Sequence, residues 1–367
     1  MSIFISTGEI SGDLHAAKLS AALHDVLPQE EIWGMAGELA LGMKREWDND
    51  ALHIMGLDRI VSSLPKLFKL RRQLAEAVVE RKPRAVIVID SPDFHIPLLS
   101  KIRSLGYRGP AIYVSPPTIW AWRSGRAKYL RRYCNMCLPL FSFEEKVLKQ
   151  HGVKSFWCGH PMIDDFHDFA PSEVMPEDPL RVALLPGSRH SELVTLMPVL
   201  EETAIQLKEM GFHPVFSVAP GLDGPCRAMV LNNSSGIETT EVSGRNLMCQ
   251  SRFVVGASGT ASVEAMLLDK FMIVLYKGTP LEWRIYTALT HTKFVTIANV
   301  MAGREIYPEL LQDKAKVENV MHYVQKYLHE PEYREDVHHQ LRLDRDMMGE
   351  PGAVGRWAEV IKGMVEA

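Results

Sequence analysis

The stretch SIFISTGEISGD (residues 2–13) decides the fold class, because a short apolar run leads directly into a glycine turn and a helical pattern. The stretch RVALLPGSRH (residues 181–190) repeats this order in the second half of the chain. A strand followed by a glycine turn and a helix is the building unit of α/β proteins. The two stretches therefore predict two Rossmann-like domains that face each other across a cleft.

Short apolar runs alternate with longer helical patterns along most of the chain. Runs rich in Val, Ile and Leu without strict alternation are typical of strands buried on both faces, as in parallel sheets. Strands are predicted at 2–6, 31–35, 85–90, 111–115, 136–140, 181–185, 213–218, 252–256, 271–276 and 293–298. Helices are predicted at 12–26, 64–81, 96–105, 190–210, 260–268, 280–291 and 308–312, and the chain from 316 onward is helical with no further strand.

The segment APSEVMPEDP (residues 170–179) is the best candidate for a linker, with three prolines and three acidic residues in ten positions. It separates a first domain at 1–169 from a second domain at 180–350. Residues 351–367 form a further helix at the end of the chain.

Composition excludes several classes of protein. The chain has 367 residues, of which 46% are hydrophobic and 23% are charged, as in an ordinary folded protein. No apolar run approaches the roughly 20 residues that cross a bilayer, and the N-terminus lacks the pattern of a signal peptide. Five cysteines do not make a disulfide framework. We therefore expect a cytoplasmic protein and not a secreted, membrane-spanning or fibrous one.

Charge is distributed unevenly along the chain. The net charge is -4, but residues 1–165 carry 22 basic and 18 acidic residues, an excess of +4, which leaves -8 for the remainder. Between Arg59 and Arg132 there are 16 basic and four acidic residues, an excess of +12. Such a block attracts anionic lipid, phosphate or nucleic acid, or it is a basic surface without a specific ligand.

Two turns in the first half carry groups that suit chemistry. Gly8 to Asp13 follow the first strand, where the first N–H groups of a helix bind an anion or a hydroxyl. Asp90 and Asp93 follow the strand AVIVI, at the edge where α/β proteins bind ligands. One carboxylate there suits a general base and the other a helix cap, with Asp90 the better base and Asp93 the better cap.

Residues 64–81 read as an amphipathic helix, capped by Ser62 or Ser63, with Pro65 in its first turn. Its N-terminal turns combine basic and apolar side chains, which is what a helix lying on a membrane surface needs. The alternative is an ordinary surface helix with one face on the core. The predicted membrane contacts are Lys66, Leu67, Phe68, Lys69, Leu70, Arg71 and Arg72.

Trp120 and Trp122 lie directly before Arg123, and Arg126 follows. Such side chains stack on sugars and clamp phosphates. A core tryptophan pair beside a solvated basic helix is the alternative.

The second half contains three glycine turns that suit a nucleotide. Gly187, Ser188 and Arg189 open a helix where a diphosphate can approach, and Arg189 can neutralise it. Ser258, Gly259 and Thr260 open another helix. Glu264 follows one turn later, where a carboxylate can bind the hydroxyls of a ribose. The third turn runs from Asn299 to Arg304 and includes Gly303. The first-domain turn is not the dinucleotide fingerprint G-x-G-x-x-G, which disfavours a nicotinamide cofactor.

Taken together, these segments resemble the lipid-A-disaccharide synthases, a family of inverting glycosyltransferases with the GT-B fold. The resemblance covers nearly the whole chain. It rests on GEISGD (8–13), IDSPDF (89–94), YVSP (113–116), WAWR (120–123), GH (159–160), LLPGSR (184–189), ASGTAS (257–262) with Glu264, NVMAGRE (299–305) and PELLQ (308–312). The loop before WAWR is one residue longer than is usual in the family, at Pro117 or Thr118.

The resemblance implies a reaction and a role for each matching residue. UDP-2,3-diacylglucosamine donates its sugar to 2,3-diacylglucosamine 1-phosphate, which gives the β-1,6-linked disaccharide 1-phosphate and UDP. Asp90 would be the base, and Glu9, Ser11 and Asp93 would line the acceptor side. Gly187, Ser188, Arg189, Ser258, Gly259, Thr260, Asn299 and Gly303 would bind the UDP-sugar, with Glu264 on the ribose. No metal and no other cofactor is expected.

The resemblance also implies a location. We expect the protein at the cytoplasmic face of the inner membrane, bound to its anionic surface, with the C-terminal helix packed on the first domain. A homodimer is one of the oligomeric states that remain open.

Two other functions are compatible with parts of the pattern. One is another UDP-sugar enzyme of GT-B fold, either a 2-epimerase or a transferase with a soluble acceptor, which needs no basic amphipathic helix. The other is a non-catalytic nucleotide- or RNA-binding protein, but Asp90 at a strand end argues against it. We therefore expect no nucleic acid among the partners.

Overall fold

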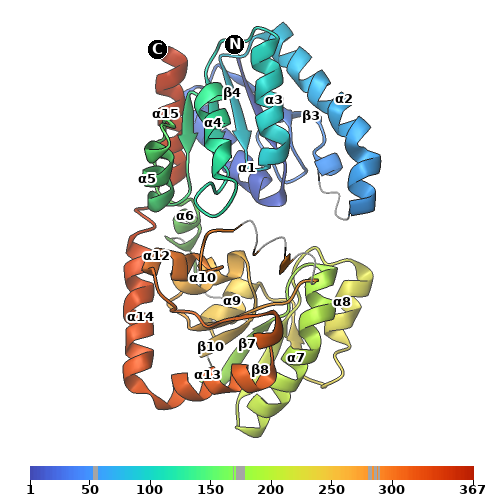
Figure 1. Ribbon diagram of the computed structural model, residues 1–367, viewed down its shortest axis with the longest axis vertical. Coiled ribbons are helices and arrows are strands. Elements are labelled where there is room, and N and C mark those ends of the chain that lie inside the picture. The colour runs from blue at the N-terminus through green and yellow to red at the C-terminus, as the bar shows by residue number, and fades with distance from the viewer. Residues whose placement is uncertain (53–56, 168, 171–177, 280–282, 285–286, 288–289) are drawn as a thin grey trace. The chain divides into compact units, whose positions relative to one another are not determined.

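The computed structural model describes residues 1–52, 57–167, 169–170, 178–279, 283–284, 287 and 290–367 (Figure 1). The chain forms two compact units. Unit 1 consists of Met1–His167 together with Met348–Ala367, and unit 2 of Asp168–Met347.

Unit 1 is built on a parallel six-stranded sheet with the strand order β3-β2-β1-β4-β5-β6. Its strands are β1 (Ser2–Thr7), β2 (Glu31–Met35), β3 (Lys44–Trp47), β4 (Ala85–Ile89), β5 (Ala111–Val114) and β6 (Met136–Leu138). Its helices are α1 (Ile10–Val26), α2 (Leu57–Arg81), α3 (Pro92–Ser104), α4 (Ala127–Tyr133), α5 (Ser142–Gln150), α6 (Met162–His167) and α15 (Ala353–Glu366), with 3-10 turns η1 (Asp50–Leu52) and η2 (Ser124–Arg126).

Successive strand residues of unit 1 alternate between two buried layers, because side chains along a strand point to opposite faces. Phe4, Val86 and Tyr113 pack with α2, α3 and α4 on one face. Ile5 and Ile87 pack with α1 and α15 on the other. Both layers are apolar, which accounts for the unbroken Val/Ile runs in the sequence.

The last helix of the chain belongs to unit 1. Helix α15, red in Figure 1, lies among the elements of the first half of the chain and packs against α1. Trp357 is its anchor, with no exposed surface, in the same cluster as Ile3 and Leu19.

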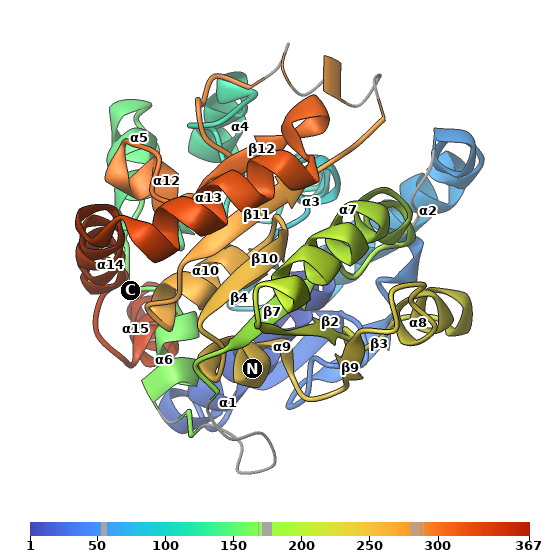
Figure 2. The same cartoon turned by 90° about the horizontal axis from the view of Figure 1, so that it is seen from below.

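Unit 2 repeats the architecture, with a parallel sheet of order β12-β11-β10-β7-β8-β9. Its strands are β7 (Arg181–Leu185), β8 (His213–Ser217), β9 (Glu238–Thr240), β10 (Phe253–Ala257), β11 (Met272–Tyr276) and β12 (Glu309–Leu311). Its helices are α7 (His190–Glu209), α8 (Gly224–Leu231), α9 (Gly244–Cys249), α10 (Thr260–Leu267), α12 (Ile297–Ala302), α13 (Val317–His329) and α14 (Pro331–Asp346), with the 3-10 turn η3 (Gln312–Lys314). Figure 2 shows α7 and α13 side by side over β7, β10 and β11.

Both sheets have the same topology. In each unit the first and fourth strands are neighbours, β1 with β4 and β7 with β10, and the chain proceeds outward from this pair in opposite directions. This is the 3-2-1-4-5-6 order of the Rossmann fold, whose ligands bind where the order reverses, at the carboxyl ends of the strands. The predicted α/β fold class is confirmed.

Several predicted elements are wrong. The strand predicted at 293–298 gives way to α12, because the Thr296 hydroxyl accepts a hydrogen bond from the N–H of Asn299 and caps a helix there. The helix predicted at 308–312 is replaced by β12, which pairs in parallel with β11 at the sheet edge. Strand pairing thus outweighs local propensity. Most of the helix predicted at 280–291 and the centre of the linker predicted at 170–179 lie outside the described residues.

The amphipathic helix is longer than predicted. Helix α2 begins at Leu57, so Ser62 and Ser63 lie inside the helix and do not cap it, and Pro65 is an interior residue. Edge strands β3 and β9 were not predicted, because each is short and polar (KREW and ETT) and lacks an apolar run. Within the described residues no helix is both long and apolar enough to cross a membrane.

Candidate functional site

The carboxyl edge of the unit 1 sheet brings the glycine turn and Asp90 together. Gly8 follows β1 and Asp90 follows β4, and these strands are paired. The N–H of Gly8 donates a hydrogen bond of 3.1 Å to Asp90 Oδ1. Gly12, in the first turn of α1, lies so close that a Cβ there would stand 2.0 Å from Asp90 Oδ2. The two motifs predicted separately from the sequence therefore form one site.

The backbone of Asp90 is held in an uncommon conformation. Asp90 and Ser91 have φ values of 55° and 39°, which are rare for residues other than glycine. The Asp90 carbonyl accepts hydrogen bonds from the hydroxyl of Tyr113 (2.5 Å) and from Nδ1 of His95 (2.8 Å). Strained conformations of this kind cost about 1–3 kcal/mol each and cluster at active sites.

His95 extends this network into the core. Burial lowers the pKa of His95 to about 4, so its ring is neutral at neutral pH. Since Nδ1 donates to the Asp90 carbonyl, Nε2 accepts from the hydroxyl of Ser6, 2.9 Å away. Sequence reasoning missed His95 and gave Tyr113 no role of its own within the motif YVSP, because a single His or Tyr in an apolar segment carries no pattern.

The Asp90 carboxyl is unusual in its ionisation. Burial raises its pKa to about 8, and the charges of Glu9 and Asp13 act in the same direction, against hydrogen bonds from Ser91 and Gly8. Its Oδ2 has no hydrogen-bond partner among the described residues. A carboxyl with this pKa and a free oxygen is suited to accept a proton near neutral pH.

The remaining predicted residues of the first turn occupy different environments. Glu9 is the N-terminal flanking residue of α1, and Glu9 and Ser11 are exposed. Asp13 is buried, and its Oδ1 accepts hydrogen bonds from Thr7 Oγ1 (2.5 Å), from the N–H of Gly37 (2.9 Å) and from Asn49 Nδ2 (3.0 Å). Asp13 thus holds the turn in place. Sequence reasoning gave it no role and missed Asn49.

Asp93 is not the cap of α3. The residue flanking the helix is Ser91, and Pro92 follows it. Asp93 is 75% exposed at its side chain, and its Oδ1 accepts from Arg123 (3.0 Å) and Arg126. The Asp93 carboxylate therefore pairs with two guanidinium groups about 30 residues away and does not cap α3.

The tryptophan loop is fixed from both sides. Trp120 Nε1 donates to Glu144 Oε1 (2.9 Å), and burial raises the pKa of the Glu144 carboxyl to about 7. The guanidinium carbons of Arg123 and Arg126 lie 4.4 and 5.1 Å from the ring centre of Trp122. The loop therefore holds two arginines, the exposed Arg123 and the buried Arg126, against one indole ring and next to Asp93.

The glycine turns of unit 2 also lie at the switch point. Gly187 follows β7, Ser258 follows β10, and these strands are paired. Gly187 has φ of 108°, and a Cβ there would lie 2.4 Å from Glu192 Oε2. That oxygen accepts from the N–H groups of Ser188 (2.9 Å) and Arg189 (3.2 Å).

The second turn of unit 2 is more open. Gly259 has φ of 151° and no heavy atom within 4 Å of an added Cβ, and Thr260 begins α10. Glu264, one turn later, accepts a hydrogen bond of 2.9 Å from Arg245 Nη2. Arg245 was not predicted as a site residue, and it fixes the carboxylate assigned to the ribose.

The side chain of Asn299, predicted to bind the UDP-sugar, is held by hydrogen bonds inside unit 2. The residue is fully buried, and its Nδ2 donates to the Tyr307 carbonyl and to Glu309, both at 2.8 Å. Its Oδ1 accepts from the N–H groups of Ile306 (2.7 Å) and Tyr307. With its amide satisfied inside unit 2, Asn299 shapes the turn that ends at Gly303 and does not offer its side chain to a ligand.

Among the described residues, no cluster of three or more His, Cys, Asp or Glu side chains could hold a metal ion. The chemistry that these residues can supply is proton transfer at Asp90 and binding of anions by N–H groups and arginines.

Comparison with known protein families shows that one family model matches most of the chain. The family model for lipid-A-disaccharide synthetase matches residues 3–350. A lipid-A-disaccharide synthase from Anaeromyxobacter dehalogenans (strain 2CP-C) is 34% identical over 381 aligned residues, covering 99% of this chain and 97% of the relative. The enzyme of the same name from Myxococcus xanthus is 32% identical and covers 98% and 96%.

Solved structures resemble the chain in fold. A UDP-N-acetylglucosamine 2-epimerase from Rickettsia bellii matches 100% of this chain and 97% of its own, with a TM-score of 0.64 and 14% identity. The glycotransferase of kitacinnamycin matches 99% and 98%, with a TM-score of 0.63 and 15% identity. At these identities the likeness concerns the fold alone, and it agrees with two Rossmann-like units of GT-B type.

Proposed function

Because the chain belongs to the lipid-A-disaccharide synthase family, and is thus a glycosyltransferase of lipid A biosynthesis, we propose that it joins UDP-2,3-diacylglucosamine to 2,3-diacylglucosamine 1-phosphate. The products are the β-1,6-linked disaccharide 1-phosphate and UDP. The observation that carries the proposal is Asp90, a half-buried carboxyl with a raised pKa and a free oxygen at the switch point of unit 1.

Asp90 is the proposed general base of an inverting transfer. Its Oδ2 accepts the proton of the acceptor 6-hydroxyl as that oxygen attacks the anomeric carbon of the donor. The new carbon–oxygen bond forms on the face opposite UDP, the bond from the anomeric carbon to the diphosphate breaks, and UDP leaves. Asp93 is the weaker candidate, because its Oδ1 already accepts from two arginines.

The turns of unit 2 are the proposed donor site. The N–H groups of Ser188 and Arg189, together with the open turn at Gly259, suit the diphosphate, whose negative charge is favoured at helix N-termini. Glu192 now accepts from the first two N–H groups, so a diphosphate must displace it. Glu264, oriented by Arg245, suits the ribose hydroxyls.

Arg123 and Arg126 are the proposed partners of the acceptor's phosphate. They share Asp93 Oδ1 and flank Trp122, whose ring can pack against a sugar. Arginine binds phosphate through charged hydrogen bonds that are about twice as strong as neutral ones. If the phosphate replaced Asp93 as the acceptor, both guanidinium groups would have an anionic partner before and after the ligand binds.

The exposed side of α2 supports the proposed membrane contact. Lys66, Phe68 and Lys69 are exposed, with Phe68 at 60% of its surface, and Arg72 is exposed beside Glu76. Of the seven predicted contact residues, Leu67 and Leu70 pack partly on the core of unit 1, and Arg71 is half-buried. The proposed contact therefore consists of the four exposed side chains, at the cytoplasmic face of the inner membrane.

The reaction is tested by incubating the purified protein with the two diacyl sugars in detergent, with a chelator present. We expect UDP and the tetraacyl disaccharide 1-phosphate, identified by mass spectrometry. A changed sugar nucleotide with no disaccharide would instead support the epimerase alternative. Release of UDP without disaccharide would mean a different acceptor.

The acceptor assignment is tested by Arg126→Gln. Loss of one charged hydrogen bond predicts a KM for the acceptor that rises about 10–100-fold, with the KM for the donor unchanged. Arg126 is buried, so Lys128→Gln, which removes an exposed cation nearby on α4, controls for the change of charge alone. Equal changes in both KM values would remove Arg126 from the acceptor site.

A further inference from the structure

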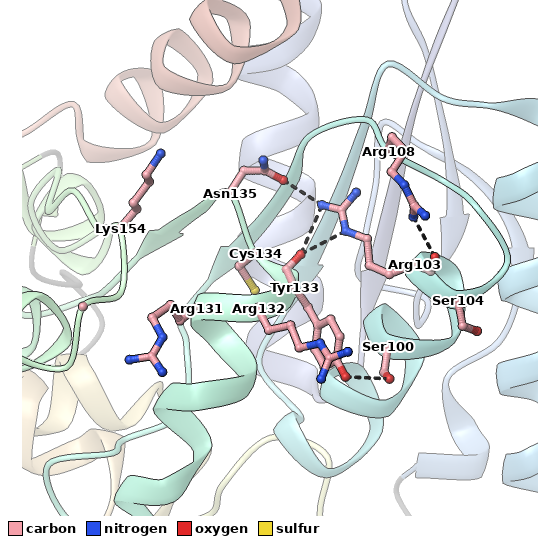
Figure 3. A pocket seen from close by; sticks show the side chains of 11 residues that line it. Ser100, Arg103, Ser104, Arg108, Arg131, Arg132, Tyr133, Cys134, Asn135 and Lys154 are labelled. Carbon is pink, nitrogen blue, oxygen red and sulfur yellow. Dashed lines mark hydrogen bonds between the residues drawn. The ribbon is translucent and has the colours of Figure 1, made fainter.

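A basic pocket lies at the opposite edge of the unit 1 sheet from Asp90. Its volume is about 660 Å³, and Figure 3 shows the side chains around it. The lining residues are Ser100, Arg103, Ser104, Arg108, Arg131, Arg132, Tyr133, Cys134, Asn135, Gly152 and Lys154. They come from the end of α3, the end of α4 and the segment after α5.

The pocket is separate from the proposed transfer site. Arg108 precedes β5 and Asn135 precedes β6, so they mark the amino ends of these parallel strands. Gly8 and Asp90 follow the carboxyl ends of β1 and β4. At about 3.3 Å of rise per residue, strands of four or five residues put roughly 15 Å between the two edges.

The lining is positively charged without local compensation. It contains five cations and no acidic residue, and within the described part of the chain none of the five forms an ion pair. Elsewhere in unit 1, by contrast, Arg81 pairs with Glu31 and Glu46. A cluster of unpaired cations raises the local concentration of anions.

Arg103 is the fixed charge at the base of this cluster. Its five N–H donors bind the carbonyl oxygens of Tyr107 (3.2 Å), Gly109 (2.7 Å) and Tyr133 (3.3 and 3.1 Å) and Asn135 Oδ1 (2.7 Å), all of them neutral. Figure 3 shows the hydrogen bonds to Tyr133 and Asn135. Its guanidinium is half-buried, and burial lowers its pKa from the ordinary value. The positive charge is therefore held in place with no carboxylate beside it.

Helix capping accounts for Arg103, and Arg131 and Arg132 also lie in the last turn of α4, but it leaves Lys154 unexplained. Cations near a helix C-terminus stabilise the last carbonyls, and Arg103 does this for α4. The guanidinium carbon of Arg132 lies 5.6 Å from the ring centre of Tyr133, whereas the Lys154 side chain makes no hydrogen bond to the described residues and comes from a separate segment. Like charges brought together from three segments repel one another, which favours an anionic ligand over a chance arrangement.

We propose that this pocket binds the phosphate of a phosphorylated ligand, either a phospholipid headgroup or a free phosphorylated small molecule. Arginine and lysine are the residues that proteins use for phosphate. One water occupies about 30 Å³ of liquid volume, so the pocket has room for a phosphate and the glycerol or sugar that carries it. This proposal does not depend on the transfer reaction.

The test uses the full chain and two kinds of probe. Glycerol 1-phosphate is the soluble probe, measured by calorimetry. Vesicles of phosphatidylcholine with and without 30% phosphatidylglycerol are the lipid probe, measured by co-sedimentation at about 0.1 M salt. The pocket variant is Arg131→Gln with Arg132→Gln and Lys154→Gln. The matched control replaces three exposed cations of unit 2, Lys208, Lys314 and Arg345, by Gln and changes the net charge equally.

We expect the pocket variant to lose binding that the control keeps. Each basic residue contributes about fivefold to partition onto an anionic surface, so three predict about a 100-fold loss with anionic vesicles. Loss with vesicles alone identifies a lipid headgroup, and loss with glycerol 1-phosphate alone identifies a small molecule. Equal binding by the pocket variant and the control with both probes would overturn the proposal. All replaced side chains are exposed, and an unchanged melting temperature checks that the variants fold.

Discussion

Replacing Asp90 by Asn removes a proton acceptor and keeps the shape of the site. The oxygen of an Asn side chain can still accept from the N–H of Gly8, which lies 3.1 Å from Asp90 Oδ1. The amide cannot take a proton, so we expect turnover to fall about 10²–10⁴-fold, the usual contribution of a general base. Binding of UDP, proposed for unit 2, is expected to stay unchanged.

The pH dependence of the wild-type protein gives the sharper form of this prediction. With the pKa of Asp90 raised to about 8 by burial, roughly one carboxyl in ten is ionised at pH 7. Only the ionised form accepts a proton. The rate should therefore rise about tenfold per pH unit below pH 8 and level off above it.

Stability should depend on pH in the opposite direction. The folded pKa lies above the ordinary value of 3.8, so between about pH 4 and pH 8 the folded chain holds this proton more tightly than the unfolded chain. The free energy of unfolding then falls as pH rises through this window, by at most about 1.4 kcal/mol per unit. Solvent access to the half-buried carboxyl reduces this value. Asp90→Asn should become more stable than the wild type as pH rises.

The assay is a profile of kcat/KM from pH 6 to pH 9, together with urea unfolding at pH 4.5 and pH 8. Asp93→Asn is the control, because Asp93 is exposed and paired with arginines, and it should keep the rising limb. A flat wild-type profile between pH 6 and pH 8 would refute the assignment of Asp90 as the base. If Asp90→Asn showed the same rise of kcat/KM with pH, the assignment of Asp90 as the base would also be refuted.

Two further predictions concern residues around the turns. Gly12→Ala should lower turnover at least tenfold with UDP binding intact, because the added Cβ would meet Asp90 Oδ2 at 2.0 Å; unchanged steady-state rates would contradict the contact. Asn299→Ala leaves the N–H groups of Ile306 and Tyr307 buried without their partner, so urea unfolding should show a loss of about 2 kcal/mol or more. If the variant kept its full stability but bound UDP more weakly, Asn299 would instead be assigned to the UDP-binding site.

The sequence predicted much of the fold because the signals were local. Several buried strands are runs of Val, Ile or Leu, such as AVIVI in β4 and RVALL in β7, and a glycine closely follows β1 at Gly8 and β7 at Gly187. The family resemblance is confirmed over nearly the whole chain. Asp90 was found in the same way, because an acid directly after an apolar strand must lie at the carboxyl edge of a parallel sheet.

The rest depends on contacts between distant segments, which local patterns do not contain. Asp93 looks like a helix cap until Arg126, 33 residues later, is placed beside it. From the sequence, Asn299 resembles a ligand-binding side chain in a glycine turn. In the structure it donates to Glu309, which lies on a strand that was predicted as a helix. In both cases long-range pairing decided which groups remain available to a ligand.

The proposed transfer site and the basic pocket differ in whether a carboxylate of the chain already occupies their anion-binding groups. In the proposed transfer site, carboxylates of the chain itself occupy the anion-binding groups. Glu192 accepts from the N–H groups of Ser188 and Arg189, and Asp93 accepts from Arg126. A phosphate that binds there must displace a carboxylate, which favours ligands with more charge and more acceptors than a single carboxylate has. No carboxylate lies among the described residues that line the pocket at the other edge, so its cations should bind phosphates with less discrimination between ligands. We therefore expect the transfer site to select its substrates, and the pocket to respond to the density of phosphate around the protein.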